Sequence, residues 1–579
     1  MKPVDRSLPG APGDDGPRPP SDRPLPRQRL WAALTPLKPA LVYSLLILGT
    51  IVFAVPFVWM ASTSVKVDRE MFTNTIRFIP IAPHPRAKSP YVDPEYFPAP
   101  RDPGSKERIT MLAERALRTG FVPPADVDAE SARAVLASGL FQKLSRLLPS
   151  LVWNGPADAL EAAVGKTVTR RMAREIFEEA HRRLCLGRIM VQSEDMRDFV
   201  LSPRVPPSKR LANLTPDVAS VSDRSEGGLD HASVAYDFGK GDRIVLSGSF
   251  DLGFDASALR RIQIYLKPDD TWHELVLSVE HGGKRWVADR ALPLANFGWT
   301  MASWQAPGPD DTSTRIRTWI VFREKDSSPR YERAPRRIRL TLEISRSSAA
   351  RAWWNKLSMN YRRVLDHIPF WRYVRVSVFL VVMNVFLTVL SSSLVAYAFA
   401  RLVWPGRDFC FLLMLATMMI PGQVTMIPHF LIWKSLGAYN TLTPLWAGSA
   451  FGNAFFIFLM RQFLLGVPRD LEDAARMDGC GFLRIYWHIM LPLVKPSLAA
   501  IAIFTFMGTW NDFMGPLIYV SDQRLYPLAF GLYAFSVQVG NDPALTMAAS
   551  LLMTLPVIAI FFFAQKYFIQ GVTLTGMKA

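Results

Sequence analysis

The sequence predicts an α-helical membrane protein with six transmembrane helices and a large α+β insertion outside the membrane, between the first helix and the second. Two observations predict this class. Of the 579 residues, 49% are hydrophobic although 20% are charged, which is unusual for one soluble domain or one helical bundle. The charge is also uneven, because residues 62–370 hold 47 Lys and Arg and 38 Asp and Glu, against 20 and 12 in the rest of the chain.

The net charge of +17 does not indicate a nucleic-acid partner. The positive excess is divided almost equally between residues 62–370 and the rest, and neither part has a basic stripe with interleaved aromatic residues. Cys185, Cys410 and Cys480 lie far apart in different kinds of segment, so we expect neither a disulfide framework nor a metal site.

The first membrane helix is predicted at residues 38–61. Its uncharged core, Ala40–Ala61, is long enough to cross a hydrocarbon layer of about 30 Å at about 1.5 Å per residue. A signal peptide is the alternative, but the run is too long and no small-x-small cleavage site follows it. Residues 1–37 are rich in Pro, Arg and Asp without an apolar period, and we expect a disordered cytoplasmic tail there.

Five further membrane helices are predicted within residues 371–579, where apolar runs of sufficient length recur. They are Val376–Ala400, Phe409–Trp433, Ser435–Met460, Leu493–Phe513 and Pro543–Gln565. Six crossings place both chain ends on the same side of the membrane.

The distribution of Lys and Arg predicts which side that is, because cytoplasmic loops carry an excess of these residues. On the side of the termini lie Arg23, Arg27, Arg29, Lys38, Arg401, Arg407, Arg461, Arg469, Arg476, Arg484, Lys495, Lys566 and Lys578. The short loops on the other side have Lys434 and Arg524, and Arg372 and Arg375 at the outer end of the second span run against the rule. We therefore expect both termini in the cytoplasm and residues 62–370 in the periplasm or outside the cell.

The insertion changes character once along its length. Residues 105–200 have helical spacing of apolar residues, as at Ile109–Leu117, whereas residues 230–345 alternate with the period of strands and predict a β-sandwich-like fold. The β-rich part contains Trp272, Trp286, Trp299, Trp304 and Trp319. Core packing explains such residues, although aromatic rings that stack on sugars would make a glycan-binding module.

The cytoplasmic loop at residues 461–492 carries the most informative pattern. Pro468 suits the first turn of a helix, and the acidic residues from Asp470 onward place negative charge at its positive end. Two small alanines allow another surface to approach closely, an Asp-Gly pair breaks the chain, and a second short helix leads into a Leu-Pro pair. The residues concerned are Glu472, Asp473, Ala474, Ala475, Asp478, Gly479, Leu491 and Pro492. A helix, turn and helix of this kind would fit a partner's groove, and an ordinary solvated connection is the alternative.

This loop resembles the EAA loop of permease subunits in binding-protein-dependent ABC importers, whose pattern is roughly E-A-A-x-x-D-G followed by I-x-L-P. The matching residues are Asp473-Ala474-Ala475, Asp478-Gly479 and Ile489-Met490-Leu491-Pro492. Asp473 stands where the family usually has Glu, and Cys480 where Ala is common. The resemblance implies that these residues couple the closure of an ATPase to movement of the spans.

Other segments resemble the maltose and multiple-sugar branch of the same importers. They are Asn360-Tyr361-Arg362, Ala396-Tyr397-Ala398-Phe399-Ala400-Arg401, Pro405-Gly406-Arg407, Trp510-Asn511-Asp512-Phe513, Gln570-Gly571-Val572 and Gly576-Met577-Lys578. The resemblance covers residues 38–85 and 355–579 and leaves out most of the insertion. It implies a carbohydrate substrate, a lipid environment, a heterodimer with a second permease, two ATPase subunits and a periplasmic solute-binding protein.

The resemblance also implies that this chain is not an enzyme and binds no cofactor, since ATP and Mg²⁺ belong to the ATPase subunits. Gly165-Lys166-Thr167 imitates the end of a phosphate-binding loop, but Leu160 occupies the place of its first glycine. The alternative function is a membrane-anchored protein that binds or processes glycans through its β-rich insertion. Six spans and an ordered cytoplasmic loop exceed what an anchor needs.

Three polar residues in the predicted spans are candidates for the substrate path, because polar groups at membrane depth are costly and often functional. These are Asn384 in the second span and the neighbouring Asn511 and Asp512 at the end of the fifth. Amide and carboxylate groups would pair with sugar hydroxyls. Hydrogen bonding between helices, for Asn384, and an interfacial helix end, for Asp512, are the alternatives.

Overall fold

The computed structural model describes residues 37–71, 78–94, 96–97, 111–112, 114–115, 120–124, 127–195, 198–200, 210–226, 229–306, 319–540 and 542–573. The chain divides into two compact units, Met1–Trp59 and Met60–Ala579. The first unit contains most of helix α2 (Leu37–Ser64). The predicted tail at 1–37 therefore lies, except for Leu37, outside the described residues.

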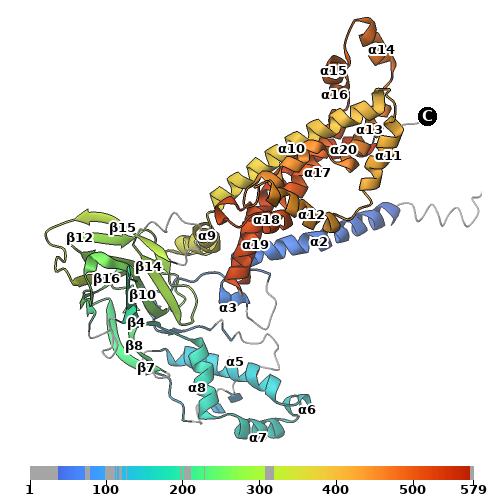
Figure 1. Cartoon of the computed structure of the whole chain (residues 1–579). Helices are drawn as coiled ribbons and strands as arrows, with labels where there is room; N and C mark the ends of the chain where they lie inside the picture. The colour runs from blue at the N-terminus through green and yellow to red at the C-terminus, as the bar shows by residue number, and fades with distance from the viewer. Residues whose placement is uncertain are drawn as a thin grey trace, which may run out of the picture. The chain divides into compact units, whose positions relative to one another are not determined.

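The membrane part is helical, as predicted (Figure 1). Four helical segments of the described chain are long and apolar enough to cross a membrane: Val42–Ser64, Phe370–Arg401, Ala447–Leu465 and Pro543–Phe563. Two further pairs pass the same test together but are bent, Arg407–Thr417 with Gly422–Ser435 by 98° and Phe482–Leu493 with Lys495–Trp510 by 80°. The described chain thus has four such segments, or up to six if each bent pair is one span.

Two predicted spans were wrong in detail because glycine and proline interrupt the apolar runs. The run Phe409–Trp433 forms two helices, α11 (Arg407–Thr417) and α12 (Gly422–Ser435), with Pro421 directly before the second. The run Ser435–Met460 is helical mainly in its second half, where α13 (Ala454–Leu465) begins after Gly452, whose φ of +80° ends the preceding 3₁₀ turns. Hydropathy alone does not detect such breaks.

The remaining helices of this part are α9 (Ala349–His367), α10 (Phe370–Arg401), α17 (Lys495–Trp510), α18 (Met514–Tyr519), α19 (Leu528–Val539) and α20 (Pro543–Thr573). The apolar helix α19 was missed by the sequence prediction, since at 12 residues it is shorter than a span. Small and polar residues such as Ser377, Asn384 and Ser392 line the buried side of α10, which lets neighbouring helices approach closely. At Gly531 of α19 an added Cβ would lie 2.3 Å from the ring of Tyr373.

The insertion begins with a small helical layer. Helices α5 (Ala129–Leu147), α6 (Ser150–Trp153), α7 (Ala157–Thr167) and α8 (Arg170–Ala180) enclose an apolar cluster that includes Leu136, Leu140 and Ile176. The imitation phosphate loop at Gly165 is the C-terminal turn of α7. The helical region was predicted to extend to residue 200, but strands begin at His181, and most of Ile109–Leu117 lies outside the described residues.

The described residues in the rest of the insertion form one curled sheet of fourteen strands, beside a separate two-stranded pair, rather than a two-sheet sandwich, which corrects the predicted fold in this respect. Two antiparallel halves are joined by a short parallel pairing in which Trp304 faces Ile320 and Gln305 faces Val321. Along the main path the strands are β1 (Lys88–Ser89), β8 (Leu229–Asp237), β4 (Leu184–Ser193), β10 (Leu259–Lys267), β14 (Thr300–Gln305), β15 (Ile320–Ser327), β12 (Lys284–Ala288), β11 (Glu274–His281), β16 (Arg337–Ser345), β9 (Arg243–Asp251) and β6 (Ala212–Asn213). Strands β5 (Asp198–Val200), β7 (Ala219–Glu226) and β13 (Leu292–Pro293) pair alongside it, and β2 (Tyr91–Val92) pairs with β3 (His181–Arg182) separately.

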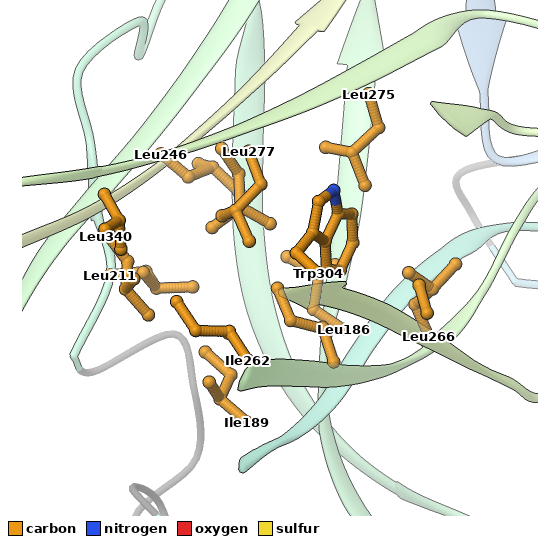
Figure 2. Packing of buried hydrophobic residues seen from close by; sticks show 14 of the residues in the cluster. Leu186, Ile189, Leu211, Leu246, Ile262, Leu266, Leu275, Leu277, Trp304 and Leu340 are labelled. Carbon is orange, nitrogen blue, oxygen red and sulfur yellow. The ribbon is translucent and has the colours of Figure 1, made fainter. Parts of the chain in front are cut away.

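The core of the sheet lies between its two halves (Figure 2). Ile189 and Ile262 come from one half and Leu277 and Leu340 from the other, around the buried ring of Trp304. Trp304 and Trp272 are buried, as the core-packing interpretation predicts, so neither ring faces a ligand. Trp286 and Trp299 are half-buried and stack on His281 and Tyr265.

Helix α9 joins the sheet to α10, and its buried polar residues bind the segment that follows α2. The amide of Asn360 donates to the carbonyls of Ser64 and Lys66, both at 2.9 Å. The buried ammonium of Lys356 forms an ion pair with Glu70 of α3 (Asp68–Met71). The start and the end of the insertion are therefore held against each other.

Candidate coupling site

The predicted helix–turn–helix is present on the chain between α13 and α17. Helix α14 (Asp470–Met477) has three acidic residues in its first turn, and α15 (Phe482–Ile485) continues through a π-helical turn (Tyr486–Met490) into α16 (Leu491–Leu493). Gly479, between α14 and α15, has φ of +80°, which side-chain-bearing residues rarely adopt. Its position is open, with no atom within 4 Å of an added Cβ.

The residues of the motif face in two directions. Glu472 and Ala475 are buried against the protein, whereas Asp473, Ala474, Asp478, Gly479 and Pro492 are exposed, and Leu491 is half-buried. The sequence predicts that both alanines face outward. Only Ala474 does so, because α14 turns Ala475 onto the cluster that contains Ala396 and Ile485.

A buried arginine holds this loop to the membrane helices. The guanidinium of Arg401, at the C-terminal end of α10, forms an ion pair with Glu472 (Nε–Oε1 3.1 Å), in which the two atoms are close but not aligned as a hydrogen bond. It donates hydrogen bonds to the carbonyls of Leu464 and Val467. The side chains of Arg401 and Glu472 are only 3% and 5% exposed. A buried charge of this kind is tolerable only while its partner stays in place, so the pair fixes α14 to the ends of α10 and α13.

Two further contacts continue along the same side of α10. The hydroxyl of Tyr397 donates to the carbonyl of Phe482 at 3.3 Å, and the hydroxyls of Ser393 and Tyr486 are 2.7 Å apart. Ser393, Tyr397 and Arg401 are spaced by four residues, so they lie on one face of the helix. Sequence reasoning missed this row, although a polar residue at every fourth position of an apolar run is the signal that would have found it.

The loop also exposes several large apolar side chains, some on α14 and some on the segment Phe482–Leu493. Met477 is 89% exposed, and Leu471, Phe482, Leu483 and Trp487 are each exposed to about half or slightly less of their surface. Leu471 and Met477 belong to α14, outside the apolar spans, and exposed apolar residues there indicate a binding surface for another protein. The loop therefore has a base anchored by polar contacts and an apolar surface without a partner in the described chain.

Each of the three candidate path residues forms hydrogen bonds within the described chain. Asn384, in the middle of α10, donates to the carbonyls of Leu380 (2.8 Å) and Leu445 (3.0 Å) and accepts from Ser449 (2.5 Å). Asn511 and Asp512 follow the last residue of α17. The amide of Asn511 donates to Met507, and the carboxylate of Asp512 accepts the N–H of Gly515. Leu445 links two of them, since Asn384 donates to its carbonyl and a Cβ added at Gly515, which Asp512 binds, would lie 3.1 Å from its side chain.

Comparison with known proteins identifies the family to which the membrane part of the chain is similar. Residues 375–574 match the family described as "Binding-protein-dependent transport system inner membrane component". The chain is 38% identical over 209 residues to the arabinooligosaccharides transport system permease protein AraQ of Halalkalibacterium halodurans, covering 36% of this chain and 75% of that protein. It is 30% identical over 233 residues to the polygalacturonan/rhamnogalacturonan transport system permease protein YtcP of Bacillus subtilis, covering 38% of this chain and 80% of that one.

Among solved structures, a bacterial ABC transporter that imports the acidic polysaccharide alginate is 28% identical, with a TM-score of 0.33 over 36% of this chain and 79% of that chain. The chain thus belongs to the binding-protein-dependent inner-membrane components: it is the multi-pass permease subunit of an ABC importer, it is not itself an enzyme and binds no cofactor, and it works with separate ATPase subunits and a periplasmic binding protein.

Proposed function

We propose that this permease imports a carbohydrate and pairs with a second, different permease subunit around the translocation path. The names of its relatives support the substrate class, since the proteins from Halalkalibacterium halodurans and Bacillus subtilis are named for the transport of arabinooligosaccharides and polygalacturonan or rhamnogalacturonan. The membrane residues that are exposed in this single chain support a second subunit, because a path for a polar solute needs walls on all sides.

The coupling proposal rests on the buried pair of Arg401 and Glu472. An ATPase subunit binds the exposed surface around Ala474 and Gly479, and the movement of that subunit displaces α14. Because Glu472 binds Arg401, the displacement reaches the end of α10 directly, and Tyr397 and Ser393 transmit it to the next two turns. The bundle then changes between inward-facing and outward-facing states while the binding protein delivers the sugar.

The proposed topology has six spans: the bent pair Arg407–Thr417 with Gly422–Ser435 crosses the membrane once, and the fifth crossing is α17, which follows the cytoplasmic loop. Residues 38–61 and 371–579 form the membrane part, and residues 62–370 lie in the periplasm, where the insertion adds contacts with the binding protein or partner permease. Both termini and the loop at 461–492 are cytoplasmic, which the excess of Lys and Arg on that side supports.

Asn384, Asn511 and Asp512 remain our candidates for the substrate path. The exposed amide of Asn511 and the partly exposed carboxylate of Asp512 are available to sugar hydroxyls. Asn384 holds the turns around Leu445 and Ser449 against α10, and a role in the path would require its amide to exchange these partners.

The coupling proposal can be tested by substituting two glycines, Gly479 and Gly406, and measuring transport and ATP hydrolysis. Replacing Gly479 with Trp should leave insertion into the membrane intact but separate transport from ATP hydrolysis in the reconstituted complex, because the bulky ring would occupy the surface on which the ATPase seats. Gly406 is the matched control: it has φ of +83°, has open space around it, and lies in the loop between α10 and α11. Gly406→Trp should cause similar backbone strain and keep transport coupled. Full transport by Gly479→Trp would refute the coupling proposal.

Co-purification tests the wider assignment. The importer assignment predicts that an ATPase and a second permease are recovered with the full-length chain. The alternative, a membrane-anchored glycan-binding protein, predicts a solitary chain that retains glycan through residues 230–345. The burial of Trp272 and Trp304 leaves less aromatic surface for that role.

A further inference from the structure

A basic hollow lies near the end of α10 that is farthest from the coupling site. It has a volume of about 720 Å³ and is lined by Arg372, Arg375, Val376, Phe379, Leu442 and Arg524. Arg372 and Arg375 stand three residues apart near the start of α10 and so share one face, while Arg524 comes from a 3₁₀ turn (Gln523–Leu525). Two segments distant in sequence thus bring three guanidinium groups to one concave site.

The positive charge of this hollow is not neutralised within the described chain. No carboxylate of the described residues forms an ion pair with Arg372, Arg375 or Arg524. Asp522 is the acidic residue nearest to Arg524 in sequence, and its carboxylate accepts the backbone N–H of Arg524 at 2.8 Å. Like charges gathered without a counter-ion destabilise one another, so an anion that entered the hollow would be bound favourably.

The proposed membrane orientation does not account for the position of these three arginines. An excess of Lys and Arg marks the cytoplasmic side of a bundle, and on the proposed outer side Arg372, Arg375 and Arg524 run against that rule. All three line this one hollow, and Lys434 is the remaining basic residue of the short outer loops after residue 370. A binding role accounts for their position where membrane orientation does not.

We propose that this hollow binds the carboxylate groups of an acidic oligosaccharide as the sugar enters the permease from outside. The inference rests on the proposed carbohydrate import and specifies its substrate class. The volume is that of a small-molecule site, large enough for one or two sugar rings. Guanidinium groups bind carboxylates through two parallel hydrogen bonds, and Phe379, Val376 and Leu442 provide an apolar wall for the C–H faces of a ring.

A lipid phosphate is the competing occupant, since arginines near the membrane surface also bind headgroups. Two features favour the sugar. The three arginines converge on one hollow instead of being distributed around the helices, and one of them, Arg524, comes from a turn outside the long apolar helices. A headgroup site on one helix would not require that turn.

The test uses the full-length chain, with the subunits that co-purify with it, in nanodiscs of phosphatidylcholine. Trigalacturonate and its fully methyl-esterified form serve as probes of the same shape with and without charge, and binding is measured by calorimetry. We expect the triple variant Arg372→Gln/Arg375→Gln/Arg524→Gln to bind trigalacturonate at least tenfold more weakly than the unsubstituted chain. We expect the ester to bind both proteins weakly and alike. The triple Lys variant should retain part of the affinity, and Lys434→Gln, a control on the same side, should retain all of it.

Equal binding of the acid and the ester, or undiminished binding by the triple Gln variant, would overturn the inference. Loss of co-purified anionic phospholipid in the Gln variant, without any binding of trigalacturonate to the unsubstituted chain, would assign the hollow to lipid and overturn it as well. If the complex imports a neutral oligosaccharide but does not bind the acid, this inference fails while carbohydrate import stands. If no ATPase is recovered and no sugar is imported, the proposed function fails whatever the binding data show.

Discussion

The ion pair between Arg401 and Glu472 gives the sharpest prediction about coupling. Replacing Glu472 with Gln keeps the size of the side chain but leaves the buried guanidinium without its counter-ion. Breaking a buried pair in this way costs about 3–5 kcal/mol, and the two carbonyls that still accept hydrogen bonds from Arg401 place the cost near the lower value. Since about 1.4 kcal/mol corresponds to a factor of ten, the fraction of molecules with α14 detached from α10 should rise roughly 100-fold.

Hydrogen exchange of the full-length protein measures that fraction directly. In Glu472→Gln the backbone amides of α14 should lose protection by about two orders of magnitude, by the same arithmetic, and ATP hydrolysis should continue with little transport. Asp473→Asn is the matched control, because the carboxylate of Asp473 is exposed and, among the described residues, pairs only with Arg476, at 3.9 Å. It should change stability by less than about 1 kcal/mol. Unchanged exchange in Glu472→Gln, or equal effects of the two variants, would refute the anchoring role of the pair.

Two further predictions concern packing and pH. Gly531→Ala places a Cβ 2.3 Å from the ring of Tyr373 and should destabilise the protein by about 1–3 kcal/mol. Gly508→Ala, in open space on α17, is the control and should be neutral or slightly stabilising. Thermal unfolding compares the two variants, and equal melting temperatures would show that α19 is not tightly packed at Gly531. His181 is buried with no hydrogen-bond partner for either ring nitrogen in the described chain, and burial, with Arg183, Arg224 and Lys267 nearby, lowers its pKa to about 3. Below pH 6.5 the unfolded chain takes up a proton that the folded chain does not, so stability should fall with pH, by about 2 kcal/mol at pH 5. His181→Gln should remove that part of the slope in denaturant unfolding measured at pH 7 and pH 5, and an unaltered slope would contradict this account.

The sequence predicted the helical membrane part, the helix–turn–helix and the strands after residue 230, because each depends on a local pattern of apolar residues. It did not predict the pairing of Arg401 with Glu472. Arg401 was predicted as a cytoplasmic charge within the segment Ala396–Arg401, and Glu472 as an acidic residue at a helix start and one of the coupling residues, but neither prediction paired the two. Their contact joins residues 71 positions apart, and it depends on how α10, α13 and α14 pack.

Local patterns also explain why the insertion was wrongly predicted as a two-sheet sandwich. Alternating apolar residues identify strands and the face that is buried, but they do not state which strand neighbours which. The curled sheet depends on the parallel pairing of Trp304 and Gln305 with Ile320 and Val321, across a stretch that no short-range pattern specifies. Without this two-residue pairing, the two antiparallel halves would be two separate sheets.

The contacts of Asn360 with Ser64 and Lys66, and of Lys356 with Glu70, also bear on how such a chain arose. They fasten the entry of the insertion to its exit, so the extra domain begins and ends at one place. A domain attached in this way can be gained or lost without moving the two membrane helices that flank it, as insertions generally are when their ends lie close together. In that sense the membrane part and the external domain are separate evolutionary units. Ser64, Lys66, Glu70, Lys356 and Asn360 lie at the junction between them.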